Sequence, residues 1–108
     1  MGTAMTSSMM TNADALALSP QDNVATALRG ITSGERIAVQ CDGATSELYA
    51  AEAIPFGHKI SIQAIGEQEM VRKYGEIIGH AVTAIPAGVH VHVHNMRSNR
   101  ATADGAKG

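Results

Sequence analysis

Residues 35–43 read ERIAVQCDG, and this stretch decides the class of fold. Apolar Ile37 and Val39 alternate with polar Arg36 and Gln40, which is typical of a strand with one buried and one exposed face. The dipeptide Asp42-Gly43 then gives a strong signal for a two-residue hairpin turn. The sequence therefore predicts that a β-hairpin starts here.

Further strands are expected after this hairpin, because alternating or apolar runs are separated by Gly and Pro turns. We expect them at residues 48–54, 58–65, 70–74, 77–85 and 89–95. One short helix is expected over residues 23–30. There Val24, Ala27, Leu28 and Ile31 would form an apolar stripe, Asp22 or Asn23 would be the N-cap, and Gly30 would end the helix. The predicted fold class is mainly β, α+β at most.

The chain of 108 residues is long enough for one domain and not for two. Residues 1–19 and 98–108 are small and polar without periodicity, so we expect a disordered leader, a domain over 20–97 and a flexible tail. No internal repeat is evident in the sequence. Aromatic residues make up only 3%, so the core must consist of aliphatic side chains.

Charge and cysteine content exclude several classes of function. The net charge of −2 lacks the basic footprint of a nucleic-acid binder. No apolar run approaches the roughly 20 residues of a membrane span. Cys41 is the single cysteine and fits a reducing compartment, where we interpret it as a small buried apolar residue. The first 18 residues carry no Lys or Arg, unlike a signal peptide, and we expect a cytoplasmic protein.

Residues 90–95 read HVHVHN and are the sharpest chemical feature of the chain. On a strand, His90, His92 and His94 share one face, which offers nitrogen ligands for a metal. On a straight strand the outer pair lies about 13 Å apart, so at most two of them would bind one ion. An exposed polar face and a proton carrier that completes a partner's site are the alternatives.

Two further motifs carry polar side chains beside turns. Residues 54–59 read IPFGHK, which places His58 and Lys59 where they could bind a carboxylate or exchange protons. The alternative is a solvated surface turn. Residues 73–79 read KYGEIIG, in which Tyr74 and Glu76 could hydrogen-bond a sugar acid; the alternative is that Tyr74 packs and the glycines fix the backbone.

Four blocks, DNVATAL at 22–28, IPFGHK, KYGEIIG and GVHVHVHN at 88–95, occur in an order that resembles a known family. The chain is similar to the small N-terminal domain of altronate and galactarate dehydratases. It is also similar to the free-standing alpha subunit of sulfolactate sulfo-lyase. The resemblance covers about residues 20–97 and implies a SAF domain, a β-clip fold of short twisted strands. It also implies a lyase, but the large catalytic domain of the dehydratases is missing here.

The resemblance implies an accessory subunit of a hydro-lyase that converts sugar acids to 2-keto-3-deoxy acids. It would cap the active site of a separate large catalytic subunit and be inactive alone. His58, Lys59 and His92 would act in catalysis, and His58, Lys59, Tyr74 and Asn95 would bind the hydroxy-acid substrate. His90, His92 and His94 would contribute to a site for Fe²⁺ or Mn²⁺ that the partner mostly holds.

Other functions stay open at the level of the sequence. The first alternative is the alpha subunit of (2R)-sulfolactate sulfo-lyase, a C–S lyase that releases sulfite. The second is a stand-alone module that binds carbohydrate acids, and the third is a metal-storage or metal-sensing protein. The substrate is not determined by these motifs, and homo-oligomer formation is left open.

Overall fold

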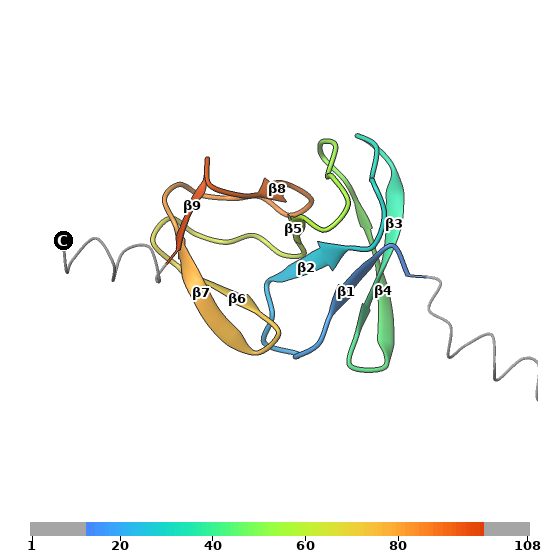
Figure 1. The fold of residues 1–108 in the computed structure, drawn as a ribbon, viewed down its shortest axis with the longest axis horizontal. Helices are drawn as coiled ribbons and strands as arrows, with labels where there is room; N and C mark the ends of the chain where they lie inside the picture. Colours follow the sequence, from blue (N-terminus) through green and yellow to red (C-terminus); the bar gives the residue numbers. More distant parts are fainter. Residues whose placement is uncertain (1–12, 99–108) are drawn as a thin grey trace, which may run out of the picture.

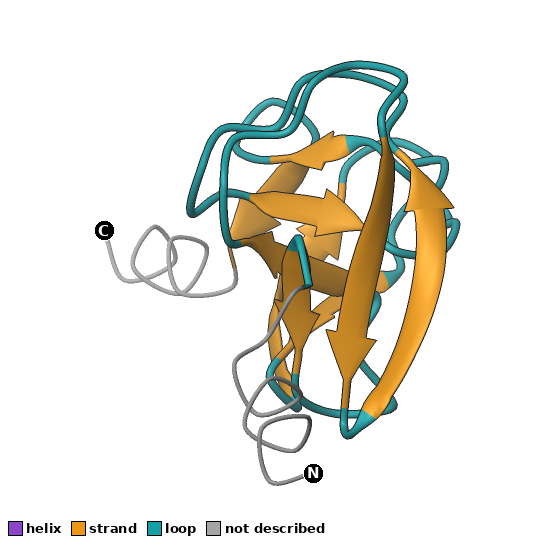
Figure 2. Ribbon diagram, turned by 90° about the vertical axis from the view of Figure 1, so that its right-hand side faces the viewer, coloured by secondary structure: helices purple, strands orange, loops and turns teal. Residues whose placement is uncertain are grey.

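The computed structural model describes residues 13–98, and every regular element within them is a β-strand (Figures 1 and 2). The strands are β1 (Ala15–Ala17), β2 (Val24–Ala27), β3 (Arg36–Cys41), β4 (Ala44–Tyr49), β5 (Lys59–Ser61), β6 (Met70–Lys73), β7 (Glu76–Ala81), β8 (His90–Val91) and β9 (Met96–Ser98). The prediction of a mainly β fold is confirmed. None of these residues forms a helix that is long and apolar enough to cross a membrane.

The strands form two sheets. The larger has the order β4-β3-β1-β2-β5-β8, and the smaller has the order β6-β7-β9. In Figure 1, β3 and β4 lie at one end of the molecule, β6, β7 and β9 at the other, and β1 and β2 between them. One core cluster is built around residues such as Ile37, Ile54 and Ile60, and a second around residues such as Val24, Val71 and Val91.

The predicted hairpin forms where the sequence places it. β3 pairs with β4 in antiparallel register from Arg36↔Tyr49 to Cys41↔Ala44. Ile37 and Val39 are buried and Arg36 is exposed, as the alternation predicts. Asp42 and Gly43 both have positive φ, the conformation that the tightest hairpin turns require. The returning strand begins at Ala44, directly after this turn, rather than at residue 48.

The predicted helix over residues 23–30 is wrong, because residues 24–27 form strand β2. β2 lies between β1 and β5 in the interior of the larger sheet, and Val24, Ala25 and Ala27 are all buried. A strand that is buried on both faces loses the polar–apolar alternation, and its residues can then mimic a helical stripe. The supposed N-caps, Asp22 and Asn23, bond to distant backbone groups instead.

Several predicted strands are shorter or displaced. The expected strands 58–65 and 77–85 are reduced to β5 and β7, and the expected strand 89–95 ends at Val91. The N-terminal boundary at residue 20 also differs, since β1 lies within the segment that we expected to be a leader. At the other end β9 runs to Ser98. The rest of the expected leader and tail, residues 1–12 and 99–108, lies outside the described residues.

The structure contains an internal repeat that the sequence did not make evident. Four ten-residue segments share one course: a strand end, a bend, a buried isoleucine, a turn and the start of the next strand. We call them crossover units one to four; they read ALRGITSGER (27–36), AAEAIPFGHK (50–59), SIQAIGEQEM (61–70) and AVTAIPAGVH (81–90). The eighth position of each unit, Gly34, Gly57, Gln68 or Gly88, has positive φ.

The crossover units pair through matching backbone bonds. The isoleucines of units one and two form a bridge, Ile31↔Ile54, and those of units three and four form another, Ile65↔Ile85. Within each pair, the N–H of the eighth residue donates to the carbonyl of the first residue of the other unit, as from Gly57 to Ala27 (2.8 Å) and from Gly88 to Ser61 (2.7 Å). The fold is therefore two related pairs of crossovers. In each pair a hairpin, β3–β4 or β6–β7, links one unit to the other.

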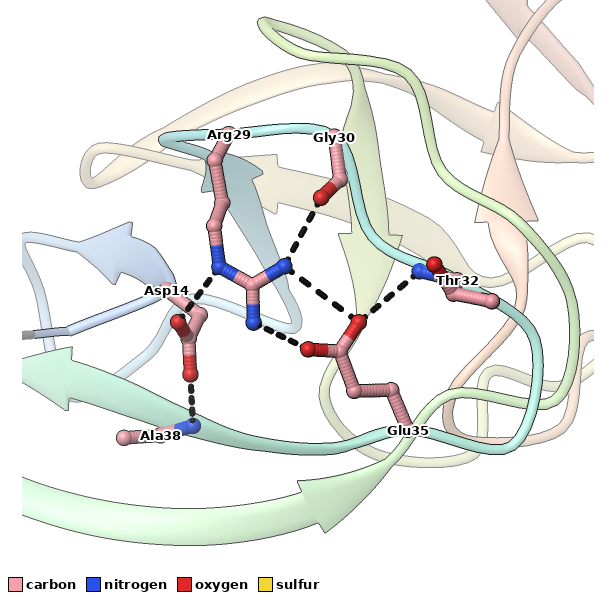
Figure 3. A network of polar contacts seen from close by, with 6 residues as sticks. All are labelled: Asp14, Arg29, Gly30, Thr32, Glu35 and Ala38. Carbon is pink, nitrogen blue, oxygen red and sulfur yellow. Dashed lines mark hydrogen bonds and ion pairs between the residues drawn. The ribbon is translucent and has the colours of Figure 1, made fainter.

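A surface network ties β1 to the first crossover unit (Figure 3). The Arg29 guanidinium donates to Asp14 at 2.8 Å and also to Glu35. Asp14 in turn accepts a 2.8 Å bond from the N–H of Ala38 in β3, and Glu35 accepts a 2.9 Å bond from the N–H of Thr32. The network holds the start of β1 against β3 and fixes the loop that leads from β2.

Candidate functional site

The second and fourth crossover units bring the candidate residues together. β5, which follows unit two, pairs antiparallel with β8, which follows unit four, in the register Lys59↔Val91 and Ile60↔His90. His58 and Lys59 therefore lie beside His90 and His92, although 32 residues separate His58 from His90 in the sequence. The His58 turn is closed by the bond from its own N–H to the Pro55 carbonyl, at 3.0 Å.

Three imidazoles form a compact cluster, which we call the histidine cluster: His58, His90 and His92. The ring centroids lie 5.0 Å apart for His58 and His90, and 4.7 Å apart for His58 and His92. His90 and His92 stack at 5.4 Å. His58 Nδ1 lies 2.9 Å from His90 Nε2, so one ring must donate a proton and the other must accept it.

We expected His90, His92 and His94 to lie on one strand, and the structure shows that they do not. β8 ends at Val91, because Asn95 closes a loop over residues 90–95: its Oδ1 accepts from the His92 N–H and its Nδ2 donates to the His90 carbonyl, both at 2.9 Å. Val93, which a continuous strand would place on the face opposite the histidines, is 79% exposed. His92 nevertheless lies against both His58 and His90, while the exposed His94 has its ring 5.4 Å from that of His90 and belongs to no ring contact with His58 among the described residues.

Two rings of the cluster, His90 and His92, favour the neutral form. Partial burial lowers the pKa of His90, and the nearby charges of His58, His92 and His94 lower it further, while Glu52 acts against them. Burial also lowers the pKa of His92, followed by the charges of His58, Lys59 and His94. Near pH 7 these rings therefore present lone pairs, the form that accepts a proton or binds a metal.

Lys59 is a partly buried cation without an acidic partner among residues 13–98. Burial lowers the pKa of its ammonium group, and the charge of Lys73 lowers it further. A buried charge is costly unless it is paired. The local environment thus favours an anion beside Lys59. The positive charge of Lys59 also acts on His92, whose pKa it lowers.

Tyr74 joins the same region through Thr26. The Tyr74 hydroxyl donates to Thr26 Oγ1 at 2.8 Å, and Thr26 is the register partner of Lys59. Lys73 Nζ lies 5.1 Å from the centre of the Tyr74 ring. The structure therefore brings together His58, Lys59, Tyr74, His90 and His92. Glu76, the other polar residue considered in the Tyr74 motif, is exposed at the start of β7.

Asn95 is the predicted site residue that the structure uses differently. It is 5% exposed, and both ends of its side-chain amide bond to the backbone of the loop that carries His90 and His92. Its visible role is to position these histidines. Cys41, expected to be buried, is only partly so, and its thiol donates to the Ser19 carbonyl.

A shallow hollow of about 310 Å³ adjoins the histidine cluster. It is lined by Val82, Val93, His94, Met96, Arg97 and Ser98. His94 therefore lines this hollow rather than converging with the other imidazoles. Sequence reasoning did not find the hollow, because its walls come from segments whose strand boundaries it misplaced.

Comparison with known proteins places these features in a family. A family model described as the altronate/galactarate dehydratase SAF domain matches residues 13–99. The chain is 46% identical over 79 residues to an altronate dehydratase of Bacillus subtilis, of which it covers 15%. It is 41% identical over 83 residues to an altronate dehydratase of Escherichia coli, covering 16% of it.

A second kind of relative is much shorter. The chain is 37% identical over 75 residues to the (2R)-sulfolactate sulfo-lyase subunit alpha of Chromohalobacter salexigens, and the match covers 80% of that protein and 68% of this chain. The matched region thus makes up a small part of the dehydratases and most of a separate lyase subunit.

Proposed function

The chain belongs to the altronate/galactarate dehydratase SAF-domain family, and from this premise we propose that it is the small subunit of a lyase. The lyase would eliminate a group next to a carboxylate-bearing carbon. In the leading form of the proposal the leaving group is water and the substrate is a sugar acid of the altronate or galactarate type. A separate large polypeptide would carry the rest of the active site, which this subunit would cap.

The observation that carries the proposal is that a lysine ammonium group without an acidic partner among the described residues lies next to imidazole bases. Lys59 has no acidic partner among the described residues and lies beside His92. The carboxylate of a sugar acid would supply the missing counter-charge. The neighbouring imidazoles would then lie close to the carbon atoms at which elimination takes place.

Each residue has a role that follows from its chemistry. The Lys59 ammonium would bind the substrate carboxylate and stabilise the negative charge that develops when the α-proton leaves. His58 and His92 would serve as proton acceptor and proton donor, because imidazole accepts a proton in its neutral form and donates one as imidazolium, and the two forms interconvert near pH 7. The Tyr74 hydroxyl would hydrogen-bond a substrate hydroxyl once it is released from Thr26. Asn95 would act by positioning His90 and His92.

A divalent metal, Fe²⁺ or Mn²⁺, belongs to this proposal. When bound, such a cation stabilises an enediolate by acting as a Lewis acid. We place the assembly in the cytoplasm, in keeping with its single cysteine.

A second candidate is the elimination of sulfite from sulfolactate. It is favoured by the relative from Chromohalobacter salexigens, a separate subunit of which the match covers 80%. The same Lys59 and histidines would serve, because both reactions remove a leaving group from the carbon next to the one that bears the carboxylate. Only the leaving group differs.

Affinity purification of the tagged protein from its own cells, followed by an assay of the eluate, tests the proposal. The assay supplies altronate, galactarate or sulfolactate together with Fe²⁺ or Mn²⁺. We expect a large co-purifying polypeptide and formation of a 2-keto acid from one of the sugar acids; release of sulfite would select the second candidate. A chain that purifies alone and turns over none of the substrates contradicts the lyase subunit.

Matched variants of the purified assembly test the residue roles. His58→Ala and His92→Ala are expected to lower turnover by at least about a hundredfold, the lower range for general acid–base catalysis. His80→Ala, on β7 and outside the cluster, is the control and should retain turnover. Wild-type rates in both cluster variants would refute the catalytic assignment.

A further inference from the structure

The histidine cluster has the donor set of a metal site. His58, His90 and His92 each offer a ring nitrogen, and these three atoms all lie within 4.8 Å of one another. Around an ion with Zn–N bonds of 2.0–2.1 Å, tetrahedral ligand nitrogens lie about 3.3 Å apart. His58 Nδ1 and His90 Nε2 are already 2.9 Å apart, so the three donors lie near the spacing that a single ion requires.

The backbone around the cluster is held in place independently of any ion. The Pro55–His58 turn bond and the β5–β8 pairing fix His58 against His90. Asn95 fixes His90 and His92 through its two amide bonds. A site whose ligands are positioned beforehand loses less conformational entropy on binding than one that must be ordered by the metal.

The chemistry of the ligands selects a class of metal. The three donors are all imidazole nitrogens, and imidazole coordinates a metal in its neutral form. Imidazole suits Zn²⁺, Fe²⁺, Ni²⁺ and Cu²⁺, whereas Mn²⁺ and Mg²⁺ prefer sites rich in carboxylate oxygens. The nearest acid in this arrangement, Glu52, already accepts a 2.9 Å bond from the His90 N–H.

From these observations we infer that His58, His90 and His92 of this chain form an open three-histidine site for a borderline divalent cation. Three protein ligands leave at least one coordination position for water or for an oxygen of a ligand, as in catalytic zinc sites. All three rings are only partly buried, so that position is reachable from outside. Lys59 would then receive one oxygen of a carboxylate whose other oxygen faces the ion. The small subunit, rather than its large partner, would supply these ligands, and with the ion bound His58 and His92 would act as its ligands instead of as proton carriers.

This inference deepens the proposed function and rests on it for its biological role, but metal binding is measured without substrate or partner. The full chain, stripped with chelator, is titrated with Co²⁺ while visible absorption is recorded, and with Zn²⁺ by calorimetry. We expect one ion per chain, with intense d–d bands typical of four or five ligands. Mn²⁺ should bind more weakly than either.

Variants identify the ligands. His58→Ala, His90→Ala and His92→Ala should each weaken Co²⁺ binding by at least about ten- to a hundredfold, since even the loss of a residue behind a ligand costs that much. His80→Ala and His94→Ala are the controls and should bind as the wild type does. Loss of binding in His94→Ala but not in His58→Ala would overturn the assignment in favour of a site within residues 90–94.

The wild-type chain provides a test that does not depend on variants that fold. Ring-nitrogen NMR signals of His58, His90 and His92 should shift on addition of one equivalent of Zn²⁺, while those of His80 stay unchanged. Absence of such shifts at millimolar Zn²⁺ refutes the site. An active assembly whose small subunit binds no metal refutes this inference and leaves the lyase proposal standing. Tight metal binding by a chain that has no partner and no turnover supports the metal site and contradicts the lyase proposal.

Discussion

At the scale of single residues, Asp22 joins two turns that are far apart in the sequence. Its carboxylate is 4% exposed and accepts four backbone N–H groups, from Leu18, Ser19, Tyr74 and Gly75, at 2.8–3.1 Å. Burial by itself raises the pKa of Asp22. The four hydrogen bonds outweigh it, so the pKa lies below its ordinary value of 3.8.

Asp22→Asn is expected to lower the free energy of unfolding at pH 7 by about 2–3 kcal/mol, because bonds to a charged acceptor become bonds to a neutral one. A lowered pKa adds stability that is complete above 3.8 and is lost as pH falls through the folded-state pKa. Urea unfolding at pH 7 and pH 3 should therefore show the gap to the wild type shrinking in acid. Asp42→Asn, at the exposed hairpin, is the control; an equal effect there would contradict this account.

Lys59 should affect function without supporting the fold. Lys59→Met keeps much of the aliphatic stem and removes a partly buried charge that has no acidic partner among the described residues. We expect the melting temperature of the chain to stay the same or rise, and turnover of the assembly to fall by about 10²–10³-fold, the loss typical of a removed electrostatic contact. Lys59→Arg should keep part of the activity. A destabilised Met variant with normal turnover would make Lys59 a structural residue.

How well the role of a single residue can be predicted depends on how far away its partners lie in the sequence. His58 and Lys59 could be proposed as site residues because the Pro-Phe-Gly turn before them is a local signal. The role of Asp22 was misread as a helix cap, since one of its donors, Tyr74, lies 52 positions away. The loop-closing role of Asn95 was missed for a different reason, while its substrate-binding role stays a prediction. Its short-range bonds fold a loop where we expected a continuous strand.

At the scale of elements, the crossover units explain both the topology and the placement of the site. Each unit turns the chain after a buried isoleucine, and units two and four, one from each pair, lead into β5 and β8, which lie side by side. The repeat escapes simple inspection because its copies start at residues 27, 50, 61 and 81, with hairpins of different length between them. Its shared features are a small first residue, an isoleucine at the fifth position and a positive φ at the eighth.

Alanine substitutions at two glycines in the eighth position distinguish the stability cost of backbone strain from that of a steric clash. Gly34 and Gly88 have nearly equal φ, +84° and +86°. A Cβ on Gly34 would meet nothing within 4 Å, so Gly34→Ala should cost only the left-handed penalty of about 1–2 kcal/mol. A Cβ on Gly88 would lie 2.3 Å from the Tyr49 carbonyl oxygen, so Gly88→Ala should cost roughly 3–5 kcal/mol.

Chemical denaturation of the two glycine variants, with the wild type beside them, makes the comparison. Because the Gly88 turn leads directly into His90, the Gly88→Ala chain should also lose Co²⁺ affinity while Gly34→Ala retains it. Equal losses of stability would show that backbone conformation alone sets the cost, and that the close approach of Tyr49 to Gly88 has no effect.

At the scale of the whole molecule, β1 holds the larger sheet together. It is only three residues long, yet it lies between β3, to which it is parallel, and β2, to which it is antiparallel. Ala15 and Ala17 are fully buried. This central position is hard to predict, because Ala-Leu-Ala has no strong strand preference and follows a run of small polar residues. The central position of β1 arises from long-range pairing alone.

The boundary of the fold can be tested by two truncations. Removing residues 1–19 deletes β1 and Asp14, so β2 and β3 lose their common neighbour and Arg29 loses one of its acidic partners. The buried backbone groups of β2 and β3 would then lack hydrogen-bond partners, at about 1–3 kcal/mol for each group. We expect that chain to lose its cooperative thermal transition and to expose apolar surface to a dye. Removing residues 1–12 keeps every described contact and should preserve the transition. If the shorter truncation unfolds as well, or the longer one melts like the wild type, β1 is not the element that closes the sheet.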